Sequence, residues 1–188
     1  MDERNEFSYD KGLLRRELLS RRAAVPDRHG KSLAIADKLL PLVGGGVMVY
    51  IAIGSEVETA EIISGLLARK DTKVYAPYTT SDGIIVPKRL VRLGKADRRG
   101  NLDADCYADN GGDIAIDYCI TPLLGFDGNG YRIGYGKGCY DRFFAKNTTY
   151  KIGISFDAQR CQFKRDICDI PLDCCVTESK VLYFKTCE

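Results

Sequence analysis

The chain of 188 residues lacks the features that usually identify membrane, secreted and nucleic-acid-binding proteins. Its longest apolar run, residues 47–53, falls well short of the ~18 residues that a membrane span needs. Its start, MDERNEFSYD, is charged and has no apolar core of a secretory signal. The formal net charge is only +2. We therefore expect a cytosolic protein without membrane or nucleic-acid partners, in which any anion site is local.

Cysteine-based zinc and redox motifs are also missing. The eight cysteines include no C-x-x-C pair, which argues against a zinc ribbon or a thioredoxin-type site. Without a secretory signal we expect most of them to be reduced and to serve as small core residues. The single histidine, His29, falls in a predicted loop between helices, and we assign it no catalytic role.

The composition that is present fits one packed domain over residues 1–188. Hydrophobic residues make up 45% and charged residues 29% of the chain, as in ordinary globular proteins. A chain of this length buries about two thirds of its unfolded surface without a disulfide or metal staple. No internal repeat or low-complexity segment interrupts it.

Two helices are expected near the start. Asp10 is placed to cap a helix over residues 11–24, in which Leu14 and Leu18 share one face. The arginines at the remaining positions, Arg15, Arg16, Arg21 and Arg22, predict a cationic face. A second helical pattern spans residues 31–42 and ends at Pro41 and three consecutive glycines.

Strand and helix patterns then alternate. Residues 47–53 form a continuous apolar run typical of a central parallel strand, and a helix with Thr59 as its cap follows. Further strands are predicted at residues 73–77, 113–122 and 151–156, with a helix at 138–146. This order predicts an α/β fold, a three-layer α/β/α sandwich with an open, mainly parallel sheet. Ligands should bind in the loops after Ile53, Pro77 and Pro122.

Residues 87–112 carry six basic and then several acidic side chains with little periodicity. We interpret this segment as a strand at the sheet edge followed by a solvated loop. A nucleic-acid surface is the alternative, but the neighbouring acids and the absence of interleaved aromatics argue against it.

The segment GFDGNGYRIGYGKGCYDR, residues 125–142, is the most informative. Three alternating glycines between a predicted strand and helix let backbone N–H groups approach an anion, and Arg132 and Lys137 add positive charge. The segment is neither a Walker A loop nor a dinucleotide G-x-G-x-x-G. The alternative is a tight turn without a ligand, which the charged neighbours make less favourable.

The pattern R-[LI]-G-x-G-x-G-x-Y-D, preceded by G-F-D-x-x-G, resembles the hallmark of 5-formyltetrahydrofolate cyclo-ligases. KGLLRREL near the start resembles that family's Lys-x-x-x-Arg helix, and YIAIGSEVETAEII resembles its strand and turn. DIPLD, residues 169–173, and the V-T-E that follows it resemble the family's C-terminal segment. The resemblance covers almost the whole chain.

The resemblance implies three groups of site residues. ATP would be bound by Lys11, Arg15, Arg132, Ile133, Gly134, Tyr135, Gly136, Lys137, Gly138, Cys139 and Tyr140. The folate substrate would contact Ile51, Glu56, Tyr135 and Cys139, and Mg²⁺ would be held by Asp141 and Asp169, since hard oxygen ligands suit it. Without the family, the alternatives are a solvated basic helix, ordinary loop or turn acids, and a core position for Ile51.

The implied reaction is the ATP-dependent conversion of 5-formyltetrahydrofolate to 5,10-methenyltetrahydrofolate with release of ADP and phosphate. Arg132 and Lys137 would be catalytic by neutralising the transferred phosphoryl group, and no enzyme nucleophile is required. We expect a monomer or simple homodimer.

Two departures from the family leave alternatives open. Cys139 stands where the family usually has a tyrosine, and GNLDADCYADNGGD replaces a G-I-P-E-P-like segment. One alternative is therefore a diverged nucleotide- or folate-binding relative that has lost the activity because of Cys139. Another is a sugar-phosphate or CoA-ester enzyme on a similar sheet.

Overall fold

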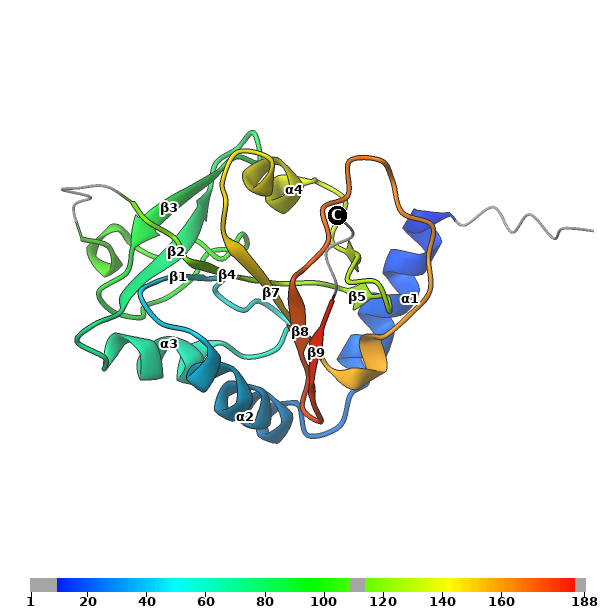
Figure 1. Cartoon of the computed structure of the whole chain (residues 1–188), viewed down its shortest axis with the longest axis horizontal. Coiled ribbons are helices and arrows are strands. Elements are labelled where there is room, and N and C mark those ends of the chain that lie inside the picture. The colour runs from blue at the N-terminus through cyan, green and yellow to red at the C-terminus, as the bar shows by residue number, and fades with distance from the viewer. Residues whose placement is uncertain (1–9, 109–113, 185–188) are drawn as a thin grey trace, which may run out of the picture.

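A seven-stranded sheet forms the centre of the computed structural model, which describes residues 10–108 and 114–184 (Figure 1). Its strand order is β3-β2-β1-β4-β7-β8-β9. The strands from β2 to β8 run parallel, while β3 and β9 are antiparallel to their neighbours at the two edges. The strands are β1 (Gly46–Val49), β2 (Lys73–Thr79), β3 (Ile85–Arg89), β4 (Tyr118–Thr121), β7 (Tyr150–Ile154), β8 (Cys174–Val176) and β9 (Val181–Tyr183).

Helices cover both faces of the sheet, which confirms the three-layer α/β/α prediction. Val47 and Val49 of β1 pack in one apolar cluster with α2 (Arg28–Leu39) and α3 (Ala60–Leu67). Met48 points the other way and packs with α4 (Cys139–Phe144). Because side chains of a strand alternate between faces, a continuous apolar run is what a sheet covered on both sides requires.

The first helix, α1 (Lys11–Ala23), lies beside the sheet rather than on one of its faces (Figure 1). Asp10 caps it as predicted, since its carboxylate accepts a hydrogen bond from the backbone N–H of Gly12 at 2.7 Å. Leu18 packs against Leu124 and Ile133, which belong to the segment around a small hairpin. That hairpin is formed by β5 (Gly125–Phe126) and β6 (Arg132–Ile133) and leads into the glycine-rich loop. Helix α1 is therefore placed against the loop that the sequence singled out.

The predicted strand at residues 47–53 ends early, at Val49. After Val49, side-chain oxygens accept the hydrogen bonds of backbone N–H groups that would otherwise bind a neighbouring strand. The Thr59 hydroxyl accepts from Ala52 N at 3.1 Å, and the Glu56 carboxylate accepts from Ile53 N at 2.9 Å. Thr59 does occupy the N-cap position of α3, but its side chain makes no capping bond to that helix.

Other predicted bounds shift by a few residues. The second helix begins at Arg28, and Pro41 lies in a short 3₁₀ turn, η1 (Leu40–Leu42). The strand predicted at 113–122 is confirmed only as β4, with residue 113 outside the described part. The predicted edge strand is β3, and two further 3₁₀ turns, η2 (Ala104–Cys106) and η3 (Asp157–Gln159), lie in loops. The short strands β5, β6, β8 and β9 were not predicted, because two or three residues carry no readable period.

The described cysteines are all unpaired thiols, and Cys106, Cys119, Cys174 and Cys175 are buried, as expected of small core residues. Cys187 lies outside the described residues. Within residues 10–108 and 114–184, no helix combines the length and the apolar character needed to cross a bilayer.

Candidate active site

The glycine-rich loop and helix α1 enclose a cavity of about 270 Å³, which we call the basic cavity. Arg15 of α1 donates a hydrogen bond from Nε to the Gly134 carbonyl at 3.0 Å. Gly136 has φ +91°, and a Cβ there would come within 3.1 Å of the Arg15 guanidinium. Glycine is therefore needed both for the backbone conformation and for the close approach of the arginine. The full lining is Lys11, Arg15, Arg132, Ile133, Gly134, Gly136, Gly138, Asp141, Arg142, Asp166, Cys168 and Asp169.

Arg132 lies at the floor of the basic cavity and is almost fully buried. Its Nη1 donates to the Ile170 carbonyl at 2.7 Å, and its Nη2 donates to Asp141 Oδ1 at 3.0 Å. The guanidinium carbon also lies 5.2 Å from the ring centroid of Phe144. These contacts fix the direction of a positive charge that Arg132 presents beside the glycines.

Lys11 lines the basic cavity and contacts two of its acidic residues, Asp166 and Asp169. Its ammonium lies 2.5 Å from Asp166 and 3.2 Å from Asp169. Partial burial alone would lower the pKa of Lys11, but the two carboxylates outweigh it and raise that pKa. Lys11 therefore remains charged throughout the physiological range.

The two carboxylates predicted to hold Mg²⁺ line this one cavity. The contacts of Asp141 run through Oδ1, which also accepts from Ile170 N at 3.2 Å, and those of Asp169 run through Oδ2. Both side chains are partly exposed toward the cavity, at 28% and 21%. Hard carboxylate oxygens beside cations that can bind phosphates fit Mg²⁺, which takes few protein ligands. Among the described residues, no group of three or more acidic, cysteine or histidine side chains forms a metal cage by itself.

A second cavity, of about 600 Å³, is lined by Tyr135, the residue between Gly134 and Gly136. We call it the wide cavity, and its lining is Leu19, Arg22, Ala52, Ile53, Gly54, Ser55, Ala96, Asp97, Arg98 and Tyr135. It is built largely from the segment after β1 and from residues 96–98. The prediction that ligand-binding loops follow the carboxyl end of β1 fits this position.

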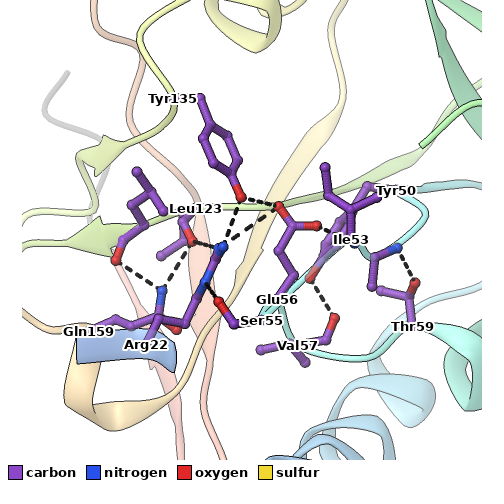
Figure 2. A network of polar contacts seen from close by, with 12 residues as sticks. Arg22, Tyr50, Ile53, Ser55, Glu56, Val57, Thr59, Leu123, Tyr135 and Gln159 are labelled. Atoms are coloured by element: carbon purple, nitrogen blue, oxygen red, sulfur yellow. Dashed lines mark hydrogen bonds and ion pairs between the residues drawn. The ribbon is translucent and has the colours of Figure 1, made fainter. Parts of the chain in front are cut away.

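Glu56, beside the wide cavity, is 5% exposed and lies in a polar network shown in Figure 2. The Tyr135 hydroxyl donates to Glu56 Oε1 at 2.9 Å, and the Arg22 guanidinium lies 3.8 Å from the same oxygen. Arg22 Nη2 in turn donates to the Tyr135 hydroxyl at 2.8 Å. One carboxylate, one phenol and one guanidinium thus meet at a single point.

Burial raises the pKa of Glu56 above its ordinary value, although the Ile53 amide, Tyr135 and Arg22 all oppose this shift. Burial likewise raises the pKa of Tyr135, so its hydroxyl keeps its proton at neutral pH. The structure also distinguishes Glu56 from its neighbour Glu58. Glu58 is exposed and pairs with His29 at 2.7 Å.

Five predicted site residues are not part of the lining of either cavity: Glu56, which is described above, and Ile51, Lys137, Cys139 and Tyr140. Lys137 is exposed and its carbonyl accepts from Arg142 at 2.7 Å. Cys139 begins α4, and its sulfur lies 3.9 Å from Arg142 Nη2. Cys139 and Tyr140 pack against the apolar cluster around Met48, and Ile51 packs against the larger cluster on the opposite face of the sheet.

The sequence interpretation of Arg22 was wrong, and Asp166 and Arg142 were missed. Arg22 was placed on a solvated cationic face, yet it is 2% exposed. The signal was available, because Arg22 follows Leu14 and Leu18 at steps of four and so continues their buried stripe. Asp166 and Arg142 carry no such signal, since only the folded chain brings them to the basic cavity.

Comparisons with known proteins identify the family of this chain. The model of the 5-formyltetrahydrofolate cyclo-ligase family matches residues 8–178. A 5-formyltetrahydrofolate cyclo-ligase of Mycoplasma pneumoniae is 40% identical over 65 residues, 34% of this chain and 40% of that protein, so this alignment spans less than half of the relative. The cyclo-ligase of Mycolicibacterium smegmatis is 31% identical over 147 residues, 70% of this chain and 73% of that protein.

A solved structure shares the fold as well. The 5,10-methenyltetrahydrofolate synthetase of Aquifex aeolicus superposes with a TM-score of 0.75 at 25% identity, covering 95% of this chain and 94% of that chain. Since the family model matches residues 8–178, a range that includes the glycine-rich loop and the residues around both cavities, the chain belongs to the 5-formyltetrahydrofolate cyclo-ligase family.

Proposed function

We propose that the protein converts 5-formyltetrahydrofolate and ATP to 5,10-methenyltetrahydrofolate, ADP and phosphate. The observation that carries this proposal is that consecutive residues of the glycine-rich loop line two different cavities. Gly134 and Gly136 line the basic cavity, and Tyr135 between them lines the wide cavity. A phosphoryl donor and a folate bound on the two sides of one short loop would meet beside it, as a direct transfer between them requires.

The basic cavity is suited to the nucleotide phosphates. Lys11, Arg15 and Arg132 converge on it from α1 and β6, and the glycine-rich loop offers backbone groups without side chains in the way. Asp141 and Asp169 would hold Mg²⁺. When bound, Mg²⁺ would neutralise negative charge on the phosphates of ATP and favour the departure of ADP.

The wide cavity is suited to the folate. Glu56 would accept hydrogen bonds from the donors of the pterin ring, and its raised pKa reflects a desolvated carboxylate that gains from such donors. Tyr135 offers a half-exposed ring at the cavity wall. Ile51 and Cys139 remain predicted substrate contacts, and of the four predicted contacts only Tyr135 is part of the lining of this cavity, with Glu56 beside it.

The chemistry needs positioning and charge stabilisation rather than an enzyme nucleophile. The formyl oxygen would attack the γ-phosphorus of ATP and ADP would leave. N10 would then attack the activated carbon, lose its proton, and displace phosphate to close the ring. Arg132 would stabilise the charge on the transferred phosphoryl group, with Lys137 assisting from the exposed end of the loop.

The test follows the near-ultraviolet absorbance of the methenyl product on mixing the protein with 5-formyltetrahydrofolate, Mg²⁺ and ATP. We expect a rise that requires ATP. Asp141→Asn should remove most of it while keeping an acceptor for Arg132, and Arg16→Asn, at an exposed position of α1, is the matched control. Absence of any rise, with ATP binding intact, would favour a diverged binding protein.

The comparisons do not favour that diverged relative, and Cys139→Tyr tests it directly. If Cys139 had abolished the activity, the change would create or greatly raise it. Nucleotide binding that depends on Mg²⁺ would argue against the sugar-phosphate or CoA-ester alternative. A cytosolic location, a monomer or simple homodimer, and the absence of nucleic-acid partners remain predictions.

A further inference from the structure

Arg22 is the buried charge that the proposed chemistry leaves without a role. A guanidinium that is 2% exposed loses nearly all its hydration, and removing an ion from water is strongly unfavourable. The preceding position on the same helical stripe is Leu18, which is fully buried. An apolar side chain at position 22 would continue that stripe without the desolvation cost. The presence of arginine therefore needs a reason other than packing.

The contacts of Arg22 come from three separate segments (Figure 2). Nε donates to the Ser55 hydroxyl at 3.1 Å, Nη1 donates to the Leu123 carbonyl at 3.3 Å, and Nη2 donates to the Tyr135 hydroxyl at 2.8 Å. Nη1 also lies 3.8 Å from Glu56. One side chain of α1 thus joins the segment after β1, the segment after β4 and the glycine-rich loop.

The proton positions in this network follow from the chemistry of its members. A guanidinium only donates hydrogen bonds, and an ionised carboxylate only accepts them. The Tyr135 hydroxyl must therefore accept from Arg22 and donate its single proton to Glu56. Tyr135 is 48% exposed, so these two hydrogen bonds and the Arg22 guanidinium 5.8 Å from its ring centroid, rather than burial, hold the side chain in place.

Helix α1 thereby holds two successive residues of the glycine-rich loop. Arg15 binds the Gly134 carbonyl on the basic cavity, and Arg22 binds the Tyr135 hydroxyl on the wide cavity. The two arginines are two helical turns apart, so they lie on the same side of the helix about 10 Å from each other. The loop is fastened to one rigid element at both of its faces.

We propose that Arg22 is a positioning residue that fastens the glycine-rich loop to the segment after β1 through Tyr135 and Glu56. It orients the buried Glu56 carboxylate and the Tyr135 side chain that lines the wide cavity, and it acts through these two residues rather than on the phosphates or the reacting atoms. The kinetic part of this inference rests on the proposed function, whereas the tethering of the loop does not.

The decisive measurement is amide hydrogen exchange over residues 131–140 of the ligand-free protein. Tyr135→Phe keeps the ion pair and removes only the hydroxyl, and Arg22→Met removes the tether as a whole. Each should speed exchange in the loop about tenfold, the effect of losing one charge-assisted hydrogen bond. Arg16→Met, an exposed arginine of the same helix, should leave it unchanged. If Arg22→Met fails to fold, Tyr135→Phe decides alone.

Kinetics then separate positioning from general destabilisation. Tyr135→Phe should raise the KM for 5-formyltetrahydrofolate about tenfold and leave the KM for ATP within about twofold. Loop exchange that does not change in folded variants would overturn the inference. A wild-type protein without cyclo-ligase activity would sink the proposed function instead, and the exchange result would still decide the role of Arg22.

Discussion

Two arginine–carboxylate pairs flank the glycine-rich loop, and they differ in a way that separates chemistry from architecture. Arg132 and Asp141 are in direct contact at 3.0 Å, and the Asp141 side chain is 28% exposed at the basic cavity. Arg22 and Glu56 are 3.8 Å apart, both side chains are below 5% exposed, and the Tyr135 hydroxyl bridges them. The Asp141 carboxylate is open to an ion, whereas the Glu56 carboxylate is almost buried and is held in one orientation by the Ile53 amide, Tyr135 and Arg22. The role of an arginine–carboxylate pair therefore depends on how exposed its carboxylate is to solvent, not on which residue types form the pair.

The largest expected difference between the two pairs is in stability. Arg22→Met leaves the Glu56 carboxylate buried without a cation and should lower the free energy of unfolding by about 3–5 kcal/mol at neutral pH. Asp141→Asn keeps its hydrogen bonds at a partly exposed position and should cost about 1 kcal/mol. Urea unfolding of both variants measures this, and equal midpoints for the two would contradict the comparison.

The next largest effect is on turnover and belongs to the other pair. Arg132→Met should lower kcat about 10²–10³-fold, because it removes a fixed charge from the phosphoryl group being transferred. The assay uses saturating ATP and folate, with Arg16→Met as the control on an exposed surface. A loss of less than about tenfold would mean that Arg132 serves only to hold Asp141.

The pH dependence of stability sharpens the contrast. Burial raises the pKa of Glu56 above about 4.3, the ordinary value for glutamate. At pH values between these two pKa values, the folded state binds more protons than the unfolded state. Stability is therefore lost as the pH rises through the folded pKa. Around Glu56 stand Arg22 from α1, Tyr135 from the loop, and Tyr50 and Tyr140, whose own pKa values burial raises well above the ordinary one.

Removing Arg22 should raise the pKa of Glu56 further, since it is the cation of that group. The loss of unfolding free energy caused by Arg22→Met should accordingly be smallest near pH 4 and grow toward neutral pH. It should grow by about 1.4 kcal/mol for each unit by which the substitution raises the pKa of Glu56. Unfolding free energies across this range test it. In the double variant Arg22→Met, Glu56→Gln this growth should vanish, and its persistence there would assign it to another group.

The smallest predicted effect concerns the two faces of the loop. Arg15→Met removes the bond to the Gly134 carbonyl and a charge of the basic cavity, so the KM for ATP should rise about tenfold while the KM for folate stays within about twofold. This is the reverse of the pattern expected for Tyr135→Phe. Steady-state kinetics with each substrate varied in turn compares them, and parallel changes in both KM values would show that the cavities are not separate.

Much of the fold could be predicted because its signals are local. The apolar run that became β1, the Asp10 cap and the alternation of strands with helices are each legible within a dozen residues. The early end of β1 was not legible. It depends on Thr59 and Glu56 binding the amides of Ala52 and Ile53, which only a returning loop can arrange.

The fold class, the glycine-rich loop and the family follow from the amino-acid sequence, because they depend on periodicity and on contiguous motifs. Which charged residues act together depends on the folded chain. Asp166 meets Lys11 across 155 positions, and Arg22 meets Tyr135 across 113. The partner of a charged side chain need not be close to it in the sequence. When folding buries a charge and removes its water, the nearest opposite charge offsets the lost hydration, and only the folded chain decides which group that is.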